Sequence, residues 1–349
     1  KFASTIESIG QKAFKGCMSL ESADFEVLEN ILFLGRESFV GVGFKTLVIP
    51  ECFGNLEYLG EHSEEVYYIY DYPAFALLPN LESLVVNASV NINSSFTACP
   101  LLKEIDFNAD VAFGTHDFLG CTSLEILRFN TDISVVGKEI LPRIWSDTFG
   151  NLIYVKGYGD YPDEPVYQMD MDGAGRGFAS YAFDNASSLK QVIFAGNVGR
   201  IEGFVFNDCP ELTEVRFAGS VDYISSAAFN NSPKVNIVLE EGNDKMLLED
   251  GVLYDIDKTR MYMLPNWDYE GVFEVPFSVK ELANRQFGAC TYYSGKQFKV
   301  TYTLNETTCK YSLSTVNPYG TTTFNTTLTG VKLHADISVI PVDCFYACS

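Results

Sequence analysis

A short phrase built around phenylalanine recurs along the chain at nearly constant spacing. Its clearest copies are AFALLPNLESLVV at 74–86, SFTACPLLKEIDF at 95–107, DFLGCTSLEILRF at 117–129, AFDNASSLKQVIF at 182–194 and VFNDCPELTEVRF at 205–217. Counted from the phenylalanine, an apolar residue stands at position +6, usually another at +9, and another at +11. Fixed core positions in every repeat predict stacked coils that share one continuous interior.

The spacing of these anchors sets the organisation of the chain. We count about eleven anchor phenylalanines, and in the regular stretches neighbouring anchors are 21 to 25 residues apart. Degenerate copies are placed at Phe39, Phe149, Phe229, Phe287 and Phe345. Insertions are expected near 56–73, 156–178 and 290–330, and the last, rich in Thr and Tyr, is interpreted as a β-hairpin. Because both ends fall inside the pattern, we expect one solenoid over 1–349, truncated within the repeat at one or both ends.

The end of the phrase, L-x-x-V-x-F, predicts a short strand, because it alternates at period two and is rich in β-branched and aromatic residues. Stacked coil upon coil, these strands form a parallel sheet. Positions +6, +9 and +11 face the core, so +8 and +10 point outward. In five coils the outward residues are Ser83 and Val85, Glu104 and Asp106, Ile126 and Arg128, Gln191 and Ile193, and Glu214 and Arg216. This mixed face suits a protein partner, and an indifferent solvated surface fits it equally.

Tyrosines in the first insertion form a second candidate binding region. The segment EEVYYIYDYP at 64–73 contains Tyr67, Tyr68, Tyr70 and Tyr72. Tyrosine is common at recognition surfaces because it combines a large area with a polar tip. A strand that covers the side of the solenoid explains the same residues.

Six of the nine cysteines occupy one position of the repeat. They stand at +3 from the anchor, and are Cys17, Cys99, Cys121, Cys209, Cys290 and Cys348. Other coils have Leu78, Ala186 and Ser232 in the same position. A slot shared with leucine and alanine predicts small buried thiols that pack without pairing. No C-x-x-C occurs, which disfavours a zinc or redox site.

The charge balance narrows the range of partners. Asp and Glu number 46 against 24 Lys and Arg, for a formal net charge of −22. Such a charge repels phosphate backbones and anionic lipid, so we expect neither nucleic acid nor a membrane as a partner. No apolar run approaches the roughly 18 residues that a membrane span requires, and the first residues lack the plan of a signal peptide.

No catalytic or metal-binding motif stands out, so we predict no catalytic residue, no metal and no cofactor. His62, His116 and His334 lie in different coils, and there is no H-E-x-x-H, Walker loop or G-x-S-x-G elbow. The glycines at 172–178 indicate an inserted loop. The carboxylates at 158–173 could hold calcium, but they lack the spacing of a known calcium loop.

The phrase AF-x-x-C-x-x-L, with I-x-x-I-G upstream as in IESIGQKAFKGC, resembles the BspA-like, or Treponema-type, leucine-rich repeat. The segment from Asp250 to Leu282 resembles the longer module of that family. The chain departs from the pattern at Phe39, where Val42 replaces the cysteine, and over 290–330. The resemblance implies a right-handed leucine-rich-repeat superhelix with short parallel strands, mostly β and loop, with few short helices.

The same resemblance implies a function. BspA-like proteins are associated with adhesion to host proteins and to other cells. We therefore expect a non-enzymatic, adhesin-like bacterial protein, secreted or on the cell surface, that binds a host matrix or cell-surface protein. The alternative is a carbohydrate-binding surface protein that uses the tyrosine-rich insertions.

Overall fold

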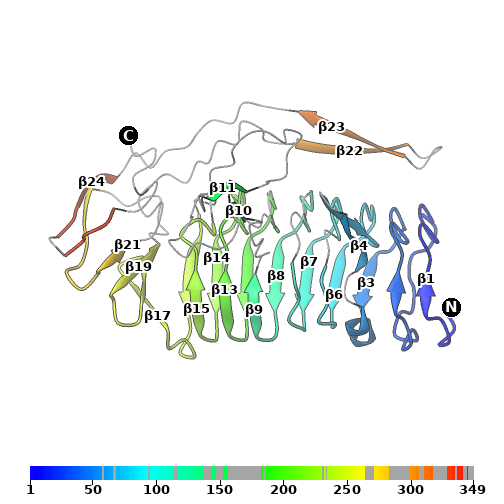
Figure 1. Cartoon of the computed structure of the whole chain (residues 1–349), viewed down its shortest axis with the longest axis horizontal. Coiled ribbons are helices and arrows are strands. Elements are labelled where there is room, and N and C mark those ends of the chain that lie inside the picture. The colour runs from blue at the N-terminus through cyan, green and yellow to red at the C-terminus, as the bar shows by residue number, and fades with distance from the viewer. Residues whose placement is uncertain are drawn as a thin grey trace.

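The computed structural model shows an elongated stack of coils. Figure 1 shows short strands repeating side by side along the long axis, with the N-terminus at one end. The structure describes residues 1–56, 59–65, 68–92, 95–113, 117–118, 120–136, 144–146, 152–155, 182–183, 186–229, 232, 234–263, 271–282, 299–305, 310–316, 328–334, 336–340 and 344.

The principal sheet has seven parallel strands in the order β16-β14-β12-β8-β7-β6-β3. They are β3 (Thr46–Ile49), β6 (Ser83–Val86), β7 (Glu104–Phe107), β8 (Ile126–Phe129), β12 (Gln191–Phe194), β14 (Glu214–Phe217) and β16 (Asn236–Leu239). Equivalent residues of neighbouring coils pair without slippage, as Val85 pairs with Asp106 and Asp106 with Arg128. The repeat phrase therefore forms the predicted strand in each of these coils.

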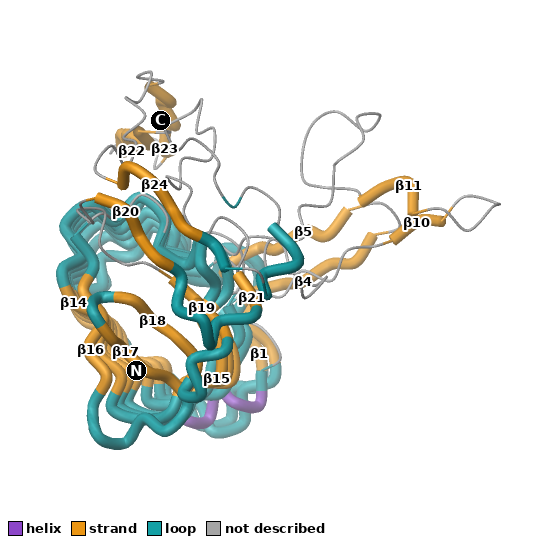
Figure 2. Tube along the Cα trace, turned by 90° about the vertical axis from the view of Figure 1, so that its left-hand side faces the viewer, coloured by secondary structure: helices purple, strands orange, loops and turns teal. Residues whose placement is uncertain are grey.

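A second parallel sheet lines another side of the coils. It has the order β15-β13-β9, with strands β9 (Ile133–Val136), β13 (Val198–Ile201) and β15 (Val221–Ile224). Figure 2 looks along the stack and shows the two sheets on different sides of each coil. Gly199 allows close approach here, because a Cβ at this position would lie 2.4 Å from the carbonyl oxygen of Ser134.

Phenylalanine rings fill the interior in two stacked rows. One row consists of the anchors, whose rings are nearly parallel, with centroids 5.0 Å apart for Phe118 and Phe183 and 5.4 Å apart for Phe183 and Phe206. The other row belongs to the strands, where the centroids of Phe129 and Phe194 are 4.6 Å apart. Because each ring packs against its equivalent in the next coil, one apolar core runs through the coils of the principal sheet. A second, smaller cluster, which includes Val252, Phe273 and Leu282, lies in the C-terminal part of the chain.

The remaining elements lie at the ends or project from the stack. The paired ones are β1 (Ser8–Ile9) with β2 (Phe33–Leu34), β4 (Gly60–Glu65) with β5 (Tyr68–Pro73), β10 (Ile144–Ser146) with β11 (Leu152–Val155), β20 (Gly271–Glu274) with β24 (Leu328–Lys332), and β22 (Lys299–Asn305) with β23 (Lys310–Val316). A four-stranded sheet contains β17 (Met246–Glu249), β18 (Val252–Asp255), β19 (Arg260–Met263) and β21 (Glu281–Leu282). The single helix of the described residues is the 3₁₀ helix η1 (Glu51–Asn55). None of these residues forms a helix long and apolar enough to cross a membrane.

The pairing of β8 with β12 corrects the predicted coil count. Residues 126–129 lie directly beside 191–194, and Phe118 stacks on Phe183, so no coil stands between them. The coil predicted at Phe149 is therefore wrong, although Phe149 itself lies outside the described residues. The physical reason is that β10 and β11, which lie between β9 and β12 in the sequence, pair with each other in a separate antiparallel sheet and add no strand to the principal sheet.

The other two insertions contain hairpins. The first predicted insertion, 56–73, holds the antiparallel pair β4 and β5. The third, 290–330, holds the antiparallel pair β22 and β23, which confirms the hairpin interpretation. In Figure 2 the hairpins β4–β5 and β10–β11 project on the same side of the stack. Phe287 and Phe345 lie outside the described residues.

Candidate interaction surface

The outward side of the principal sheet, called the sheet face below, is the candidate interaction surface. The burial pattern alternates in its central strands, with buried residues such as Ile105 and Leu127 facing the core. All ten residues predicted to point outward lie on this face and are partly exposed: Ser83, Val85, Glu104, Asp106, Ile126, Arg128, Gln191, Ile193, Glu214 and Arg216. The predicted orientation is therefore confirmed, whereas a binding role for these residues stays a prediction.

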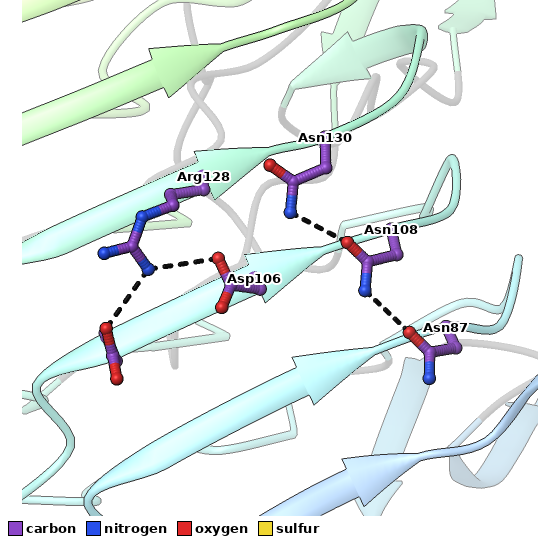
Figure 3. A network of polar contacts seen from close by, with 6 residues as sticks. Asn87, Asp106, Asn108, Arg128 and Asn130 are labelled. Atoms are coloured by element: carbon purple, nitrogen blue, oxygen red, sulfur yellow. Dashed lines mark hydrogen bonds and ion pairs between the residues drawn. The ribbon is translucent and has the colours of Figure 1, made fainter.

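Arg128 is the centre of the first charged cluster of the sheet face. Its Nη1 donates hydrogen bonds to Glu104 Oε2 and Asp106 Oδ1, each at 3.1 Å (Figure 3). Partial burial lowers the pKa of Arg128, but the two carboxylates outweigh this effect and raise the pKa overall. A guanidinium held by two carboxylates stays charged and keeps a fixed orientation.

Arg216 is the centre of the second cluster. Its Nη1 donates to Glu240 Oε1 at 2.8 Å, and its Nε donates to Glu214 Oε1 at 3.1 Å. Hydrogen bonds to Glu240 and Glu214 raise the pKa of Arg216. In each cluster one arginine is bound by two carboxylates. Both acids of the first cluster lie on the neighbouring strand β7, whereas Glu214 lies on the same strand as Arg216 and Glu240 follows β16.

Uncharged residues separate the two clusters. Ile193 on β12 is in register with Arg128 on one side and with Arg216 on the other. Gln191, on the same strand, is in register with Ile126 and Glu214. Because Ile126 and Ile193 are both partly exposed, an aliphatic zone lies between the charged clusters.

Polar ladders run along both margins of the sheet face. At one margin Lys45 pairs with Glu21 at 2.9 Å, and the Lys103–Glu82 and Lys190–Glu125 pairs are each 2.8 Å long. At the other margin Asn130 donates to Asn108, and Asn108 to Asn87, each at 2.8 Å (Figure 3). The residues of these two ladders carry no net charge together. Glu240 occupies the position of the asparagine ladder in its own coil, because its backbone N–H bonds to the carbonyl oxygen of Phe217 as that of Asn130 bonds to the carbonyl oxygen of Phe107.

Sequence reasoning missed Glu240 and the outward residues of β16. The strand β16 begins seven residues after Phe229, whereas β14 begins eight residues after Phe206. This one-residue deletion moves the outward positions to Asn236 and Val238. The apolar residues at alternate positions, Val235, Ile237 and Leu239, could have indicated this shift in the sequence.

The tyrosine cluster is only partly described. Tyr67 lies outside the described residues, and Tyr68, Tyr70 and Tyr72 belong to the strand β5. The register pairs Tyr70 with Ser63 and Tyr72 with Glu61. The acidic run 158–173, the glycine-rich segment 172–178 and His116 also lie outside the described residues.

Neither histidine among the described residues lies in a group of metal ligands, because those residues hold no group of three or more His, Cys, Asp or Glu arranged for a metal. His62 is on β4. The Nδ1 atom of His334 accepts a hydrogen bond from the backbone N–H of Asp336 at 3.3 Å, and its ring packs on Phe277 with centroids 4.8 Å apart.

The cysteine slot is buried in the middle of the stack. Cys99, Cys121 and Cys209 are fully buried free thiols, as predicted. Burial raises the pKa of Cys99, and the neighbouring Cys121 adds to this effect. Cys17 is exposed, which corrects the prediction for its coil. The reason is that described coils cover it on one side only.

Comparison with known proteins adds a family. The repeat described as BspA type Leucine rich repeat region matches in six copies, over residues 1–63, 61–144 and 176–248. Comparison with curated proteins gives no match.

Several solved structures are similar. The pneumococcal vaccine antigen PcpA is similar over 71% of this chain and 53% of its own, with 16% identity and a TM-score of 0.31. A leucine-rich repeat protein from Bacteroides ovatus is similar over 83% and 70%, with 18% identity and a TM-score of 0.30. A leucine rich cell surface protein from Faecalibacterium prausnitzii is similar over 71% and 62%, with 16% identity and a TM-score of 0.32. The chain spans about half the length of the pneumococcal antigen.

Proposed function

Because this chain belongs to the BspA-type leucine-rich-repeat family, we propose that it is a non-enzymatic binding protein whose sheet face contacts another protein. The proposal places it outside the cell or on the cell surface, as an adhesin-like protein with a host matrix or cell-surface protein as its partner. It assigns no catalytic residue and no cofactor.

The observation that carries this proposal is the rigid presentation of the sheet face. Seven in-register strands hold the outward residues, and buried phenylalanine rows lie behind them. The arginines are held by acids, so little side-chain freedom remains to be lost on binding. A preorganised surface with charged clusters around an aliphatic centre resembles the composition of protein interfaces.

A binding screen followed by one substitution tests the proposal. The chain is offered immobilised host-matrix proteins and a glycan array in the same buffer at physiological salt. We expect saturable protein binding that Ile193→Arg abolishes, because the added charge lies in the aliphatic centre of the face. Ile256→Arg is the matched control, since Ile256 is 51% exposed and lies outside the principal sheet. Equal loss of binding in both variants would rule out the sheet face as the contact.

Carbohydrate binding by the first insertion is the second candidate. It is favoured by β5, which carries tyrosines at three alternate positions, the spacing at which strand residues share a face. Aromatic rings on one face form a platform on which sugar rings stack. The same screen separates the two candidates, because glycan binding that survives Ile193→Arg and is lost in Tyr70→Ala would support this one.

A further inference from the structure

We propose that the sheet face binds an extended cationic segment in which two lysine or arginine side chains, four residues apart, flank an aliphatic residue. This inference rests on the proposed function, because it names the chemistry of the partner that the sheet face accepts. It follows from the charge, free acceptors and spacing of the two arginine clusters.

The clusters leave the face with a net negative charge. Arg128 is shared by two carboxylates, and Arg216 is shared by two others, so each cluster has a net charge of −1. The marginal ladders do not offset this charge, because their lysines are matched one to one by glutamates. The chain as a whole carries −22, so long-range attraction also favours a cation.

Each carboxylate of the clusters still has an oxygen to offer. The arginines bind Glu104 Oε2, Asp106 Oδ1, Glu214 Oε1 and Glu240 Oε1. The second oxygen of each group has no protein partner among the described residues, and Glu104 and Glu240 side chains are each 43% exposed. A carboxylate accepts several hydrogen bonds, so a lysine or arginine can bind it while its own arginine stays in place.

An anionic ligand would be disfavoured on the same surface. Both guanidinium groups of the face already point at carboxylates, and they are outnumbered by them. An incoming carboxylate or phosphate could reach an N–H of Arg128 other than those of Nη1, but it would lie beside carboxylates that outnumber the arginines. The face therefore discriminates by charge sign in favour of cations.

The distance between the two acidic sites determines how far apart the basic residues of the bound segment must be. The acids of the first cluster lie on β7, and Glu214 lies on β14, three strand positions away in the sheet order. At about 4.8 Å per strand, the two acidic sites are about 14 Å apart. Residues i, i+2 and i+4 of an extended chain share one face, and i and i+4 are about 13 Å apart. Two basic residues at i and i+4 therefore reach both acidic sites.

The middle residue meets the aliphatic zone. Ile126 and Ile193 lie on β8 and β12, the two strands between β7 and β14. Residue i+2 of the segment then lies over these isoleucines, where leucine, isoleucine or valine buries apolar surface. The segment runs across the strands, along the axis of the stack.

Three labelled peptides of one length test the pattern by fluorescence anisotropy. The first contains Lys-Thr-Leu-Thr-Lys, the second Glu-Thr-Leu-Thr-Glu, and the third Lys-Lys-Leu-Thr-Thr, which keeps the composition and changes the spacing. We expect the first to bind tightest, the third about fivefold more weakly, and the second not at all, with binding of the first falling as salt rises. Equal binding of the first and second peptides overturns the inference, as does equal binding of the first and third.

Two double variants with equal charge change locate the site. Glu104→Gln/Glu214→Gln is expected to weaken binding of the first peptide by about tenfold. Asp222→Asn/Glu249→Gln removes two charges from exposed ion pairs outside the sheet face, and should change it by less than about twofold. Circular dichroism of both variants verifies folding. Equal weakening by the two variants overturns the inference.

The result also distinguishes this inference from the proposed function. If a protein found in the screen loses binding in Ile193→Arg but not in Glu104→Gln/Glu214→Gln, the cationic segment is wrong and the protein-binding function stands. If the peptides behave as expected while Ile193→Arg still binds the protein, the preference of the face for cations holds and the function proposed for it fails.

Discussion

Truncating Phe183 to alanine should destabilise the protein far more than truncating Phe14. Phe183 is fully buried, and its ring contacts those of five other phenylalanines, which are Phe107, Phe113, Phe118, Phe129 and Phe206. Phe14 is partly exposed and contacts the rings of Phe2 and Phe39. The two anchors occupy the same position of the repeat, so they differ in surroundings rather than in type.

The magnitude follows from burial and from the cavity. Exposing a buried phenylalanine side chain costs about 2–3 kcal/mol of transfer free energy. The cavity left at Phe183 cannot close, because in-register strands hold the coils on both sides, and the total becomes about 3–5 kcal/mol. At Phe14 we expect about 1–2 kcal/mol, since water already reaches the ring.

Urea unfolding followed by far-ultraviolet circular dichroism measures both free energies. The slope of the free energy against urea should be similar in wild type and both variants if the same surface is exposed. A cost for Phe14→Ala equal to or above that of Phe183→Ala would refute the stacked-core reasoning.

Three further predictions concern thiols, pH and the asparagine ladder. Iodoacetamide should modify Cys17 in the native protein but leave Cys99 unmodified until urea unfolds it, and peptide mass mapping that finds Cys99 labelled in the native state would contradict its burial. The hydrogen bond and charge of Lys103 lower the pKa of Glu82 below 4.5, so this pair stabilises the fold above that pH and is lost as pH falls through the lower folded value. The melting temperature of wild type should therefore fall more steeply below pH 4.5 than that of Glu82→Gln, and parallel curves would argue against the pair. Asn108→Ala removes two ladder hydrogen bonds and should cost about 1–2 kcal/mol in urea unfolding, whereas no change would show that the ladder contributes nothing.

The fold of a single coil could be predicted from the sequence, because the repeat phrase alone determines which residues form the strand and which face the core. The period-two alternation was enough to place Glu104 and Ile126 on one face, because strand geometry fixes which side a residue occupies. It could not show that Arg128 binds two acids of the neighbouring strand, because that depends on side-chain conformations across neighbouring coils.

The sequence pattern also could not show which coils are neighbours when an insertion separates them in the chain. The phenylalanine at 149 has the right residue type and a tolerable spacing, yet β8 pairs with β12. Which coils are neighbours is decided by the packing of Phe118 on Phe183 and by strand hydrogen bonds. These contacts join residues far apart in the chain, so they cannot be predicted from any single copy of the repeat.

The junction between β8 and β12 also bears on how such a protein can change over evolution. Residues 137–181 separate β9 from β12 in the sequence, yet β12 pairs in register with β8, and β13 with β9. The entropic cost of closing a loop rises only with the logarithm of its length, by about 0.6 kcal/mol for each doubling. A gene that gains a domain at this junction therefore keeps its core, and recombination can exchange the residues between β9 and β12 while the stack is inherited unchanged.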